Sequence, residues 1–138
     1  MPAKDIYHDC VKNALIKDGW RITHDPLSLK WGKKDMYVDL GAEQLLAAAK
    51  AERKIAVEIK SFTGLSEMSE LEKAIGQYII YRDVLGEVEP DRELYLAVSQ
   101  EIASGLFDEP IGELVLNNNR VRLLVFESEE EAIVKWTL

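Results

Sequence analysis

The stretch Ile55-Ala56-Val57-Glu58-Ile59-Lys60 decides the fold, because it alternates as a β-strand does and carries charges where a buried strand rarely has them. Its three branched apolar residues fall on one face, and Ala56, Glu58 and Lys60 fall on the other. Glu58 and Lys60 lie about 6.6 Å apart along the strand, from two residues at about 3.3 Å each. Such charges are costly to bury unless they are paired or bind a metal. The stretch therefore predicts either a functional site or an edge strand or sheet face that is open to water.

The elements around this strand indicate the fold class. A strand over residues 54–62 is followed by a long helix that begins near Ser66 or Ser69 and ends at Gly86, and then by an apolar strand over 92–98. Ser69-Glu70-Leu71-Glu72 fits the S-x-x-E capping box of a helix start. A long helix between two apolar strands predicts a right-handed parallel crossover. We expect one α/β domain over residues 1–138, on the borderline of α+β, with a mixed sheet of four to five strands and helices on both faces.

The rest of the chain is interpreted by periodicity and turn residues. Segment 111–116 is left open between helix and strand, and Asn117-Asn118-Asn119 is expected to be a turn. Residues 41–51, which are rich in Ala, Leu and Glu, are expected to be helical. The other expected elements are helices over 4–17 and 99–106 and strands over 20–24, 27–30, 36–40 and 121–126.

Composition limits the function classes. The 138 residues carry a net charge of −8, which argues against tight, sequence-blind DNA binding. Cys10 is the only cysteine, so a disulfide within the chain and a Cys-based zinc site are excluded. No apolar run approaches the roughly 20 residues that span a bilayer, and no signal peptide is recognisable, so a cytoplasmic protein without membrane association is expected. The basic cluster at 30–34 offers Lys33 and Lys34 as phosphate contacts, although such clusters are usually solvated loops.

Five polar residues form a constellation that can carry chemistry. Asp39 ends a predicted strand, and Glu58 and Lys60 follow on the next one. Gln77 and Tyr81 lie one turn apart on the following helix. Two carboxylates on adjacent strands can bind one Mg²⁺, which lowers the pKa of a bound water and neutralises charge on a phosphodiester. Lys60 could then position the nucleophile or stabilise the transition state, and Gln77 could orient the water.

These residues resemble known families. Asp39 followed by Glu58-Ile59-Lys60 resembles the PD-(D/E)XK nuclease superfamily, with Val38 in place of the proline. Gln77 and Tyr81 resemble the Q-x-x-x-Y element of its Holliday-junction-resolvase-like branch. Over nearly the entire chain the sequence is similar to the XisH family. The segments that carry this likeness are Ala3-Lys4-Asp5-Ile6-Tyr7-His8, Lys17-Asp18-Gly19-Trp20-Arg21-Ile22-Thr23-His24-Asp25-Pro26, Val38-Asp39-Leu40-Gly41-Ala42-Glu43, Ala56-Val57-Glu58-Ile59-Lys60-Ser61-Phe62, Gln77-Tyr78 and Ile133-Val134-Lys135-Trp136.

The resemblance implies both a fold and a site. It implies a restriction-endonuclease-like domain with Asp39, Glu58 and Lys60 as catalytic positions, Gln77 supporting them, and Mg²⁺ or Mn²⁺ on Asp39 and Glu58. Many members of the superfamily add an acid from the first helix. That region offers Asp5, His8 and Asp9, and the supporting residues are expected to be His8, Asp9 and Tyr81. If His8 takes that position, a preference for Mn²⁺ follows, whereas a packing role for His8 is the alternative.

Two functions stay open at this stage. XisH proteins are known chiefly from cyanobacteria as factors that control excision of the fdxN element during DNA rearrangement, alongside a partner called XisI. The first hypothesis is accordingly a metal-dependent DNA endonuclease that hydrolyses phosphodiesters. The alternative is a non-catalytic regulatory subunit that keeps the nuclease fold and acts through a XisI-like partner or a recombinase. Both allow a homo-oligomer, and the first requires DNA as a partner despite the acidic charge.

Overall fold

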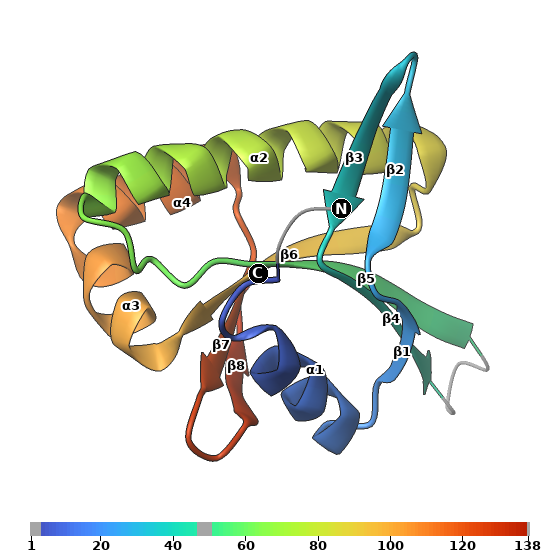
Figure 1. Ribbon diagram of the computed structural model, residues 1–138, viewed down its shortest axis with the longest axis horizontal. Helices are drawn as coiled ribbons and strands as arrows, with labels where there is room; N and C mark the ends of the chain where they lie inside the picture. Colours follow the sequence, from blue (N-terminus) through green and yellow to red (C-terminus); the bar gives the residue numbers. More distant parts are fainter. Residues whose placement is uncertain (1–3, 47–50, 138) are drawn as a thin grey trace.

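The computed structural model describes residues 4–46 and 51–137, which form a mixed sheet with helices on both faces (Figure 1). Residues 132–136, for which the sequence predicts no particular element, form a strand. The elements in chain order are α1 (His8–Lys17), β1 (Arg21–His24), β2 (Leu27–Trp31), β3 (Lys34–Val38), β4 (Leu40–Leu46), β5 (Ala51–Ile59), α2 (Glu67–Val88), β6 (Arg92–Ser99), α3 (Gln100–Ser104), the 3₁₀ turn η1 (Leu106–Asp108), α4 (Pro110–Asn119), β7 (Leu123–Glu127) and β8 (Ala132–Trp136).

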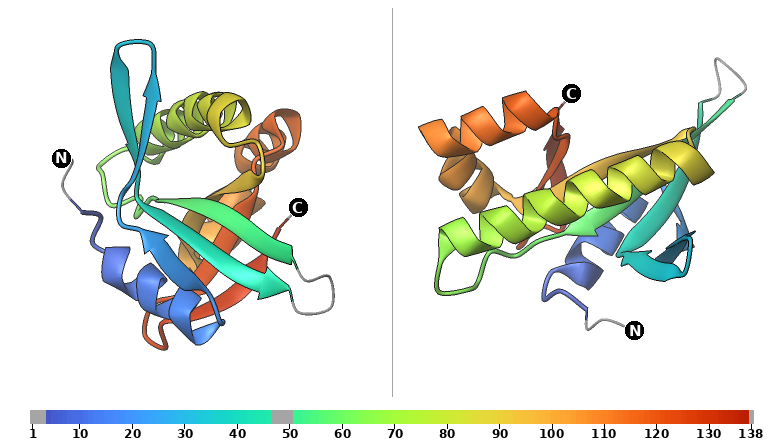
Figure 2. Two further views of the ribbon diagram at one scale, coloured as in Figure 1. Left: turned by 90° about the vertical axis from the view of Figure 1, so that its right-hand side faces the viewer. Right: turned by 90° about the horizontal axis from the view of Figure 1, so that it is seen from above.

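The main sheet has six strands in the order β1-β4-β5-β6-β7-β8. β5 pairs with β6 and β6 with β7 in parallel, while the other pairs are antiparallel. The predicted parallel crossover through α2 is therefore confirmed. β2 and β3 form a separate hairpin that projects beside α2 and away from the sheet (Figures 1 and 2).

The prediction of four to five strands was wrong, and one segment accounts for much of the difference. Residues 40–46 form β4, where a helix was expected over 41–51; residues 47–50 lie outside the described part of the chain. β4 pairs along its length with β5 and also with β1. Two neighbouring strands satisfy its backbone and bury Ala42 completely, and this tertiary pairing overrides the helix propensity of Ala, Leu and Glu.

The side chains of β5 alternate between two faces as predicted, and each face enters a different core. Ile55, Val57 and Ile59 pack in a cluster with residues of α1, and Ala56 packs in the cluster beneath α2. α1 and α2 lie on opposite sides of the sheet (Figure 1). Glu58 shares the α2 face with Ala56 and is only 5% exposed. Because β5 is an inner strand and Glu58 is buried, the alternative of an edge strand or water-exposed face is wrong.

Two helix boundaries differ from the sequence interpretation, since α1 begins at His8 and not at Lys4, and α2 continues through Gly86 to Val88. The N-cap of α2 is Ser66, whose hydroxyl accepts from the amide of Ser69 at 3.1 Å. Of the two predicted starts the structure therefore confirms Ser66, which has extended backbone, and the S-x-x-E motif at Ser69 lies within the helix. Segment 111–116 is helical, and the expected asparagine turn belongs to the last turn of α4, where the Asn119 side chain donates to the Val115 carbonyl at 3.0 Å. Within the described residues, no helix is long and apolar enough to cross a membrane.

Candidate functional site

Five residues singled out from the sequence meet in one pocket of about 190 Å³. Asp39 is the single residue between β3 and β4, Glu58 lies near the end of β5, and Lys60 follows that strand directly. Gln77 and Tyr81 reach the pocket from α2. The lining residues are Lys4, Asp5, Tyr37, Asp39, Glu58, Ile59, Lys60, Gln77 and Tyr81.

The two strand carboxylates are held by reciprocal bonds to backbone amides. The Asp39 amide donates to Glu58 Oε1 at 3.2 Å, and the Ile59 amide donates to Asp39 Oδ2 at 2.7 Å. The second oxygen of Glu58, Oε2, lies 3.6 Å from Lys60 Nζ. Because one oxygen of each carboxylate accepts a hydrogen bond from a backbone amide, the carboxylate is fixed in position and its other oxygen can bind a ligand.

Burial controls the protonation of Glu58. Burial, followed by the charge of Asp39, raises the pKa of Glu58 from 4.5 to about 8, against a smaller opposing effect of Lys60. The pKa of Tyr81 is also raised, by burial first and then by Glu58 and Asp39. Glu58 is therefore protonated at neutral pH in the metal-free protein, because two adjacent carboxylates in low dielectric resist ionising together.

The donor set of the pocket fits a hard divalent cation. Asp39 and Glu58 present carboxylate oxygens, and the buried Gln77 Oε1 has no hydrogen-bond partner within the described part of the chain. Mg²⁺ often takes only one or two protein carboxylates and completes its shell with water and phosphate. Residues 4–46 and 51–137 contain no group of three or more His, Cys, Asp or Glu side chains placed to hold a metal.

Asp5 is the acid of the first-helix region that reaches the pocket. Its carboxylate accepts from the amides of Ser61 at 3.1 Å and Tyr7 at 2.9 Å, and it joins the chain ahead of α1 to the segment after β5. Asp5 was one of three candidates in the sequence. A signal that could have favoured it is its place just before α1, since a free carboxylate there can accept backbone amides.

His8 and Asp9 lie away from the pocket, so the structure does not bring these two predicted supporting residues to the site. His8 is buried, and its Nε2 lies 2.6 Å from Asp25 Oδ1, which is a packing and pairing role. Asp9 is 78% exposed and lies 3.8 Å from Lys4 Nζ. Lys33 and Lys34 are exposed at the turn of the β2–β3 hairpin, also outside the pocket.

Comparison with known proteins identifies the family. The family model for XisH protein matches residues 1–134. The chain belongs to the XisH family. A crystal structure of an XisH family protein from Nostoc punctiforme PCC 73102 is 38% identical with a TM-score of 0.89, covering 97% of this chain and 100% of that one. A crystal structure of an fdxN element excision controlling factor protein from Anabaena variabilis is 40% identical with a TM-score of 0.89, covering 98% and 100%. No match was found among functionally curated proteins.

Both likenesses extend over nearly all of the chain. The TM-score of 0.89 to the Anabaena variabilis structure shows that the two chains share the overall fold.

Proposed function

We propose that the protein is a metal-dependent DNA endonuclease of the PD-(D/E)XK type that takes part in the excision of a DNA element. The observation that carries this proposal is the buried, amide-anchored pair of Asp39 and Glu58 with Lys60 beside it in one pocket. The link to excision comes from the Anabaena variabilis relative, which is described as an fdxN element excision controlling factor protein. The parallel β5-α2-β6 unit with antiparallel β4 beside it supports a restriction-endonuclease-like arrangement.

Asp39 and Glu58 would hold Mg²⁺ or Mn²⁺. When bound, such an ion lowers the pKa of a water and offsets the charge of a phosphodiester. Glu58 has to release its proton before it can act as a ligand, so binding is expected to strengthen with pH as this carboxyl ionises.

Lys60 and Gln77 supply the remaining functions. The ammonium of Lys60 lies 3.6 Å from Glu58 and can donate to a phosphate oxygen or hold an attacking water in line. The orphaned Gln77 Oε1 can accept a hydrogen bond from that water. Tyr81, one turn further along α2, closes the same side of the pocket.

The net charge of −8 favours a second function, that of a non-catalytic regulatory subunit. DNA binding normally rests on phosphate contacts from a basic surface. In this second function the nuclease fold is retained and the protein acts on DNA only through a XisI-like partner or a recombinase.

Cleavage assays separate the two functions. Supercoiled, linear and branched DNA are incubated with the protein and Mg²⁺, Mn²⁺ or EDTA. We expect metal-dependent cleavage that falls at least about a hundredfold in Glu58→Gln and in Lys60→Met, since each removes a group that faces the transition-state charge. Glu101→Gln and Lys135→Met remove the same charges from exposed positions on α3 and β8 and are expected to cleave normally.

Absence of cleavage with both metals on every DNA form, in a folded protein, would overturn the catalytic proposal. Co-purification with a protein partner without DNA binding would then support the regulatory function.

A further inference from the structure

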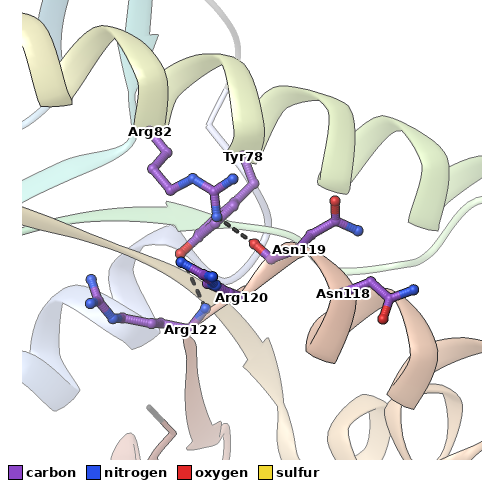
Figure 3. Close-up of a pocket in the computed structure, with 6 residues that line it drawn as sticks. All are labelled: Tyr78, Arg82, Asn118, Asn119, Arg120 and Arg122. Atoms are coloured by element: carbon purple, nitrogen blue, oxygen red, sulfur yellow. Dashed lines mark hydrogen bonds between the residues drawn. The ribbon is translucent and has the colours of Figure 1, made fainter.

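A second pocket, separate from the carboxylate pocket, gathers three arginines. It has a volume of about 510 Å³ and lies between α2, the end of α4 and the start of β7 (Figure 3). It shares no lining residue with the carboxylate pocket, because Gln77 and Tyr81 face one side of α2 and Tyr78 and Arg82 face another. Its lining residues are Tyr78, Arg82, Asn118, Asn119, Arg120 and Arg122.

The floor of this arginine pocket is rigid. Tyr78 is 1% exposed, and its hydroxyl donates to the Leu94 carbonyl at 2.9 Å and accepts from the Arg122 amide at 3.1 Å. Arg82 donates to the Asn119 carbonyl, and its guanidinium carbon lies 5.5 Å from the centre of the Tyr78 ring. These contacts join α2 to the end of α4 and the start of β7, so the pocket is preformed.

Arg120 occupies a position where glycine is the favoured residue. It ends α4 in the left-handed conformation, with φ 52°, which costs a residue with a Cβ more than it costs glycine. Its side chain is exposed and forms no hydrogen bond or ion pair within the described residues. An arginine at this turn therefore adds charge to the pocket at the expense of backbone strain.

The charges around the pocket are not balanced. Arg122 Nη1 lies 3.5 Å from Glu93 Oε2, and the same carboxylate also pairs with Arg53 at 3.4 Å. Among the described residues, the three arginines of the pocket thus have one carboxylate as an ion-pair partner, and Arg122 shares it with Arg53. The pocket is therefore locally positive in a protein whose net charge is −8. Arginine binds carboxylates and phosphates through two parallel hydrogen bonds, so this cluster suits an oxyanion.

An adjoining hollow of about 500 Å³ extends the site. It shares Arg120 and Arg122 with the arginine pocket and adds the apolar side chains of Leu116 and Val121 to its wall. An acidic side chain next to an apolar one matches both hollows, with its carboxylate on the arginines and its apolar neighbour against Leu116 and Val121. We propose that the arginine pocket and this hollow bind an acidic segment of a partner protein, with its carboxylates on Arg120 and Arg122. The proposal does not depend on nuclease activity.

Fluorescence anisotropy with a labelled peptide tests this site. The probe is Glu-Leu-Glu-Glu-Leu-Glu with blocked ends, and its control has glutamine in place of every glutamate. We expect the acidic peptide to bind at least tenfold more tightly than its neutral control, and more weakly as salt rises. Arg120→Gly is expected to weaken binding about tenfold while the melting temperature stays equal or rises, because glycine relaxes the turn. Arg120→Gly combined with Arg122→Gln should abolish binding.

A charge-matched variant is the control. Arg21→Gln combined with Lys135→Gln removes two positive charges elsewhere, since Arg21 is 70% exposed in β1 and Lys135 is exposed in β8. Normal binding by this variant supports the site. The proposal is overturned if the peptide does not bind at 1 mM, if the neutral peptide binds equally, or if the control loses as much affinity. It is also overturned if Arg120→Gly impairs binding of duplex DNA instead, or abolishes self-association of the protein in sedimentation, because the occupant would then be DNA or a second copy.

Discussion

Glu58 is the residue at which burial and function conflict most directly. Burial and the adjacent Asp39 raise its pKa from 4.5 to about 8, so between these pH values the folded protein holds a proton that the unfolded chain releases. The free energy of unfolding therefore falls as pH rises through this window, by up to about 1.4 kcal/mol per pH unit. The full effect, present below pH 4.5 and lost above pH 8, is on the order of 4–5 kcal/mol.

Glu58→Gln should remove this pH dependence. Urea unfolding of the metal-free protein is expected to show the variant more stable than the native chain by a few kcal/mol at pH 9 and nearly equal to it at pH 5. Mg²⁺ at pH 8 should raise the melting temperature of the native chain and not that of the variant. Glu101→Gln, which changes an exposed carboxylate on α3, should behave like the native chain in both measurements. A native chain as stable as Glu58→Gln at pH 9 would contradict the raised pKa.

The residues of the site could be predicted from the sequence only where strand alternation or helix spacing determines the face on which a side chain lies. Alternation placed Glu58 and Lys60 on one face, and the four-residue spacing placed Gln77 and Tyr81 on one side of α2. The position of Asp5 could not be predicted in this way, because it depends on the chain ahead of α1 reaching the amide of Ser61, 56 residues away. His8 and Asp9 were equally plausible by composition, and only packing separates them from the pocket.

At the scale of elements, the start of α2 offers a direct comparison between the sequence motif and the observed cap. The hydroxyl of Ser66 accepts from the Ser69 amide, so Ser66→Ala is expected to lower the free energy of unfolding by about 0.5–1 kcal/mol. Ser69→Ala removes the serine that the capping-box motif selected and is expected to change stability by less than about 0.5 kcal/mol. Chemical denaturation of both variants measures the difference. A larger loss in Ser69→Ala would mean that the helix starts a turn later.

The elements differ in how much of them the sequence determines. α1, β5, α2 and β6 carry strong periodicity and are present near their predicted positions. β4 is different, because the strand state of residues 40–46 comes from pairing Leu40 with Val57 and Arg21 with Glu43 across long sequence separations. Such pairing leaves no local pattern in a segment rich in helix-forming residues.

At the scale of the whole molecule, the distribution of charge matters more than the total of −8. The β2–β3 hairpin stands away from the sheet (Figure 2) and carries Lys30, Lys33 and Lys34 at its end, beside Trp31, which is 53% exposed. β3 runs from Lys34 straight toward Asp39, five residues on, a distance of about 17 Å along an extended chain. A DNA strand in the carboxylate pocket would therefore pass within reach of the hairpin.

Under the proposed nuclease function, the hairpin lysines contact phosphates on the same DNA. Lys33→Gln combined with Lys34→Gln should weaken DNA binding and reduce the slope of log Kobs against log salt concentration by about 1.8, since each phosphate contact contributes about 0.9. Anisotropy titrations at several salt concentrations measure this slope. Lys17→Gln combined with Lys135→Gln removes the same charge from α1 and β8 and should leave the slope unchanged. An equal effect of both pairs would mean that the hairpin acts only through net charge. If only the hairpin pair lowers the slope, the acidic protein binds DNA through the basic β2–β3 hairpin next to its carboxylate pocket.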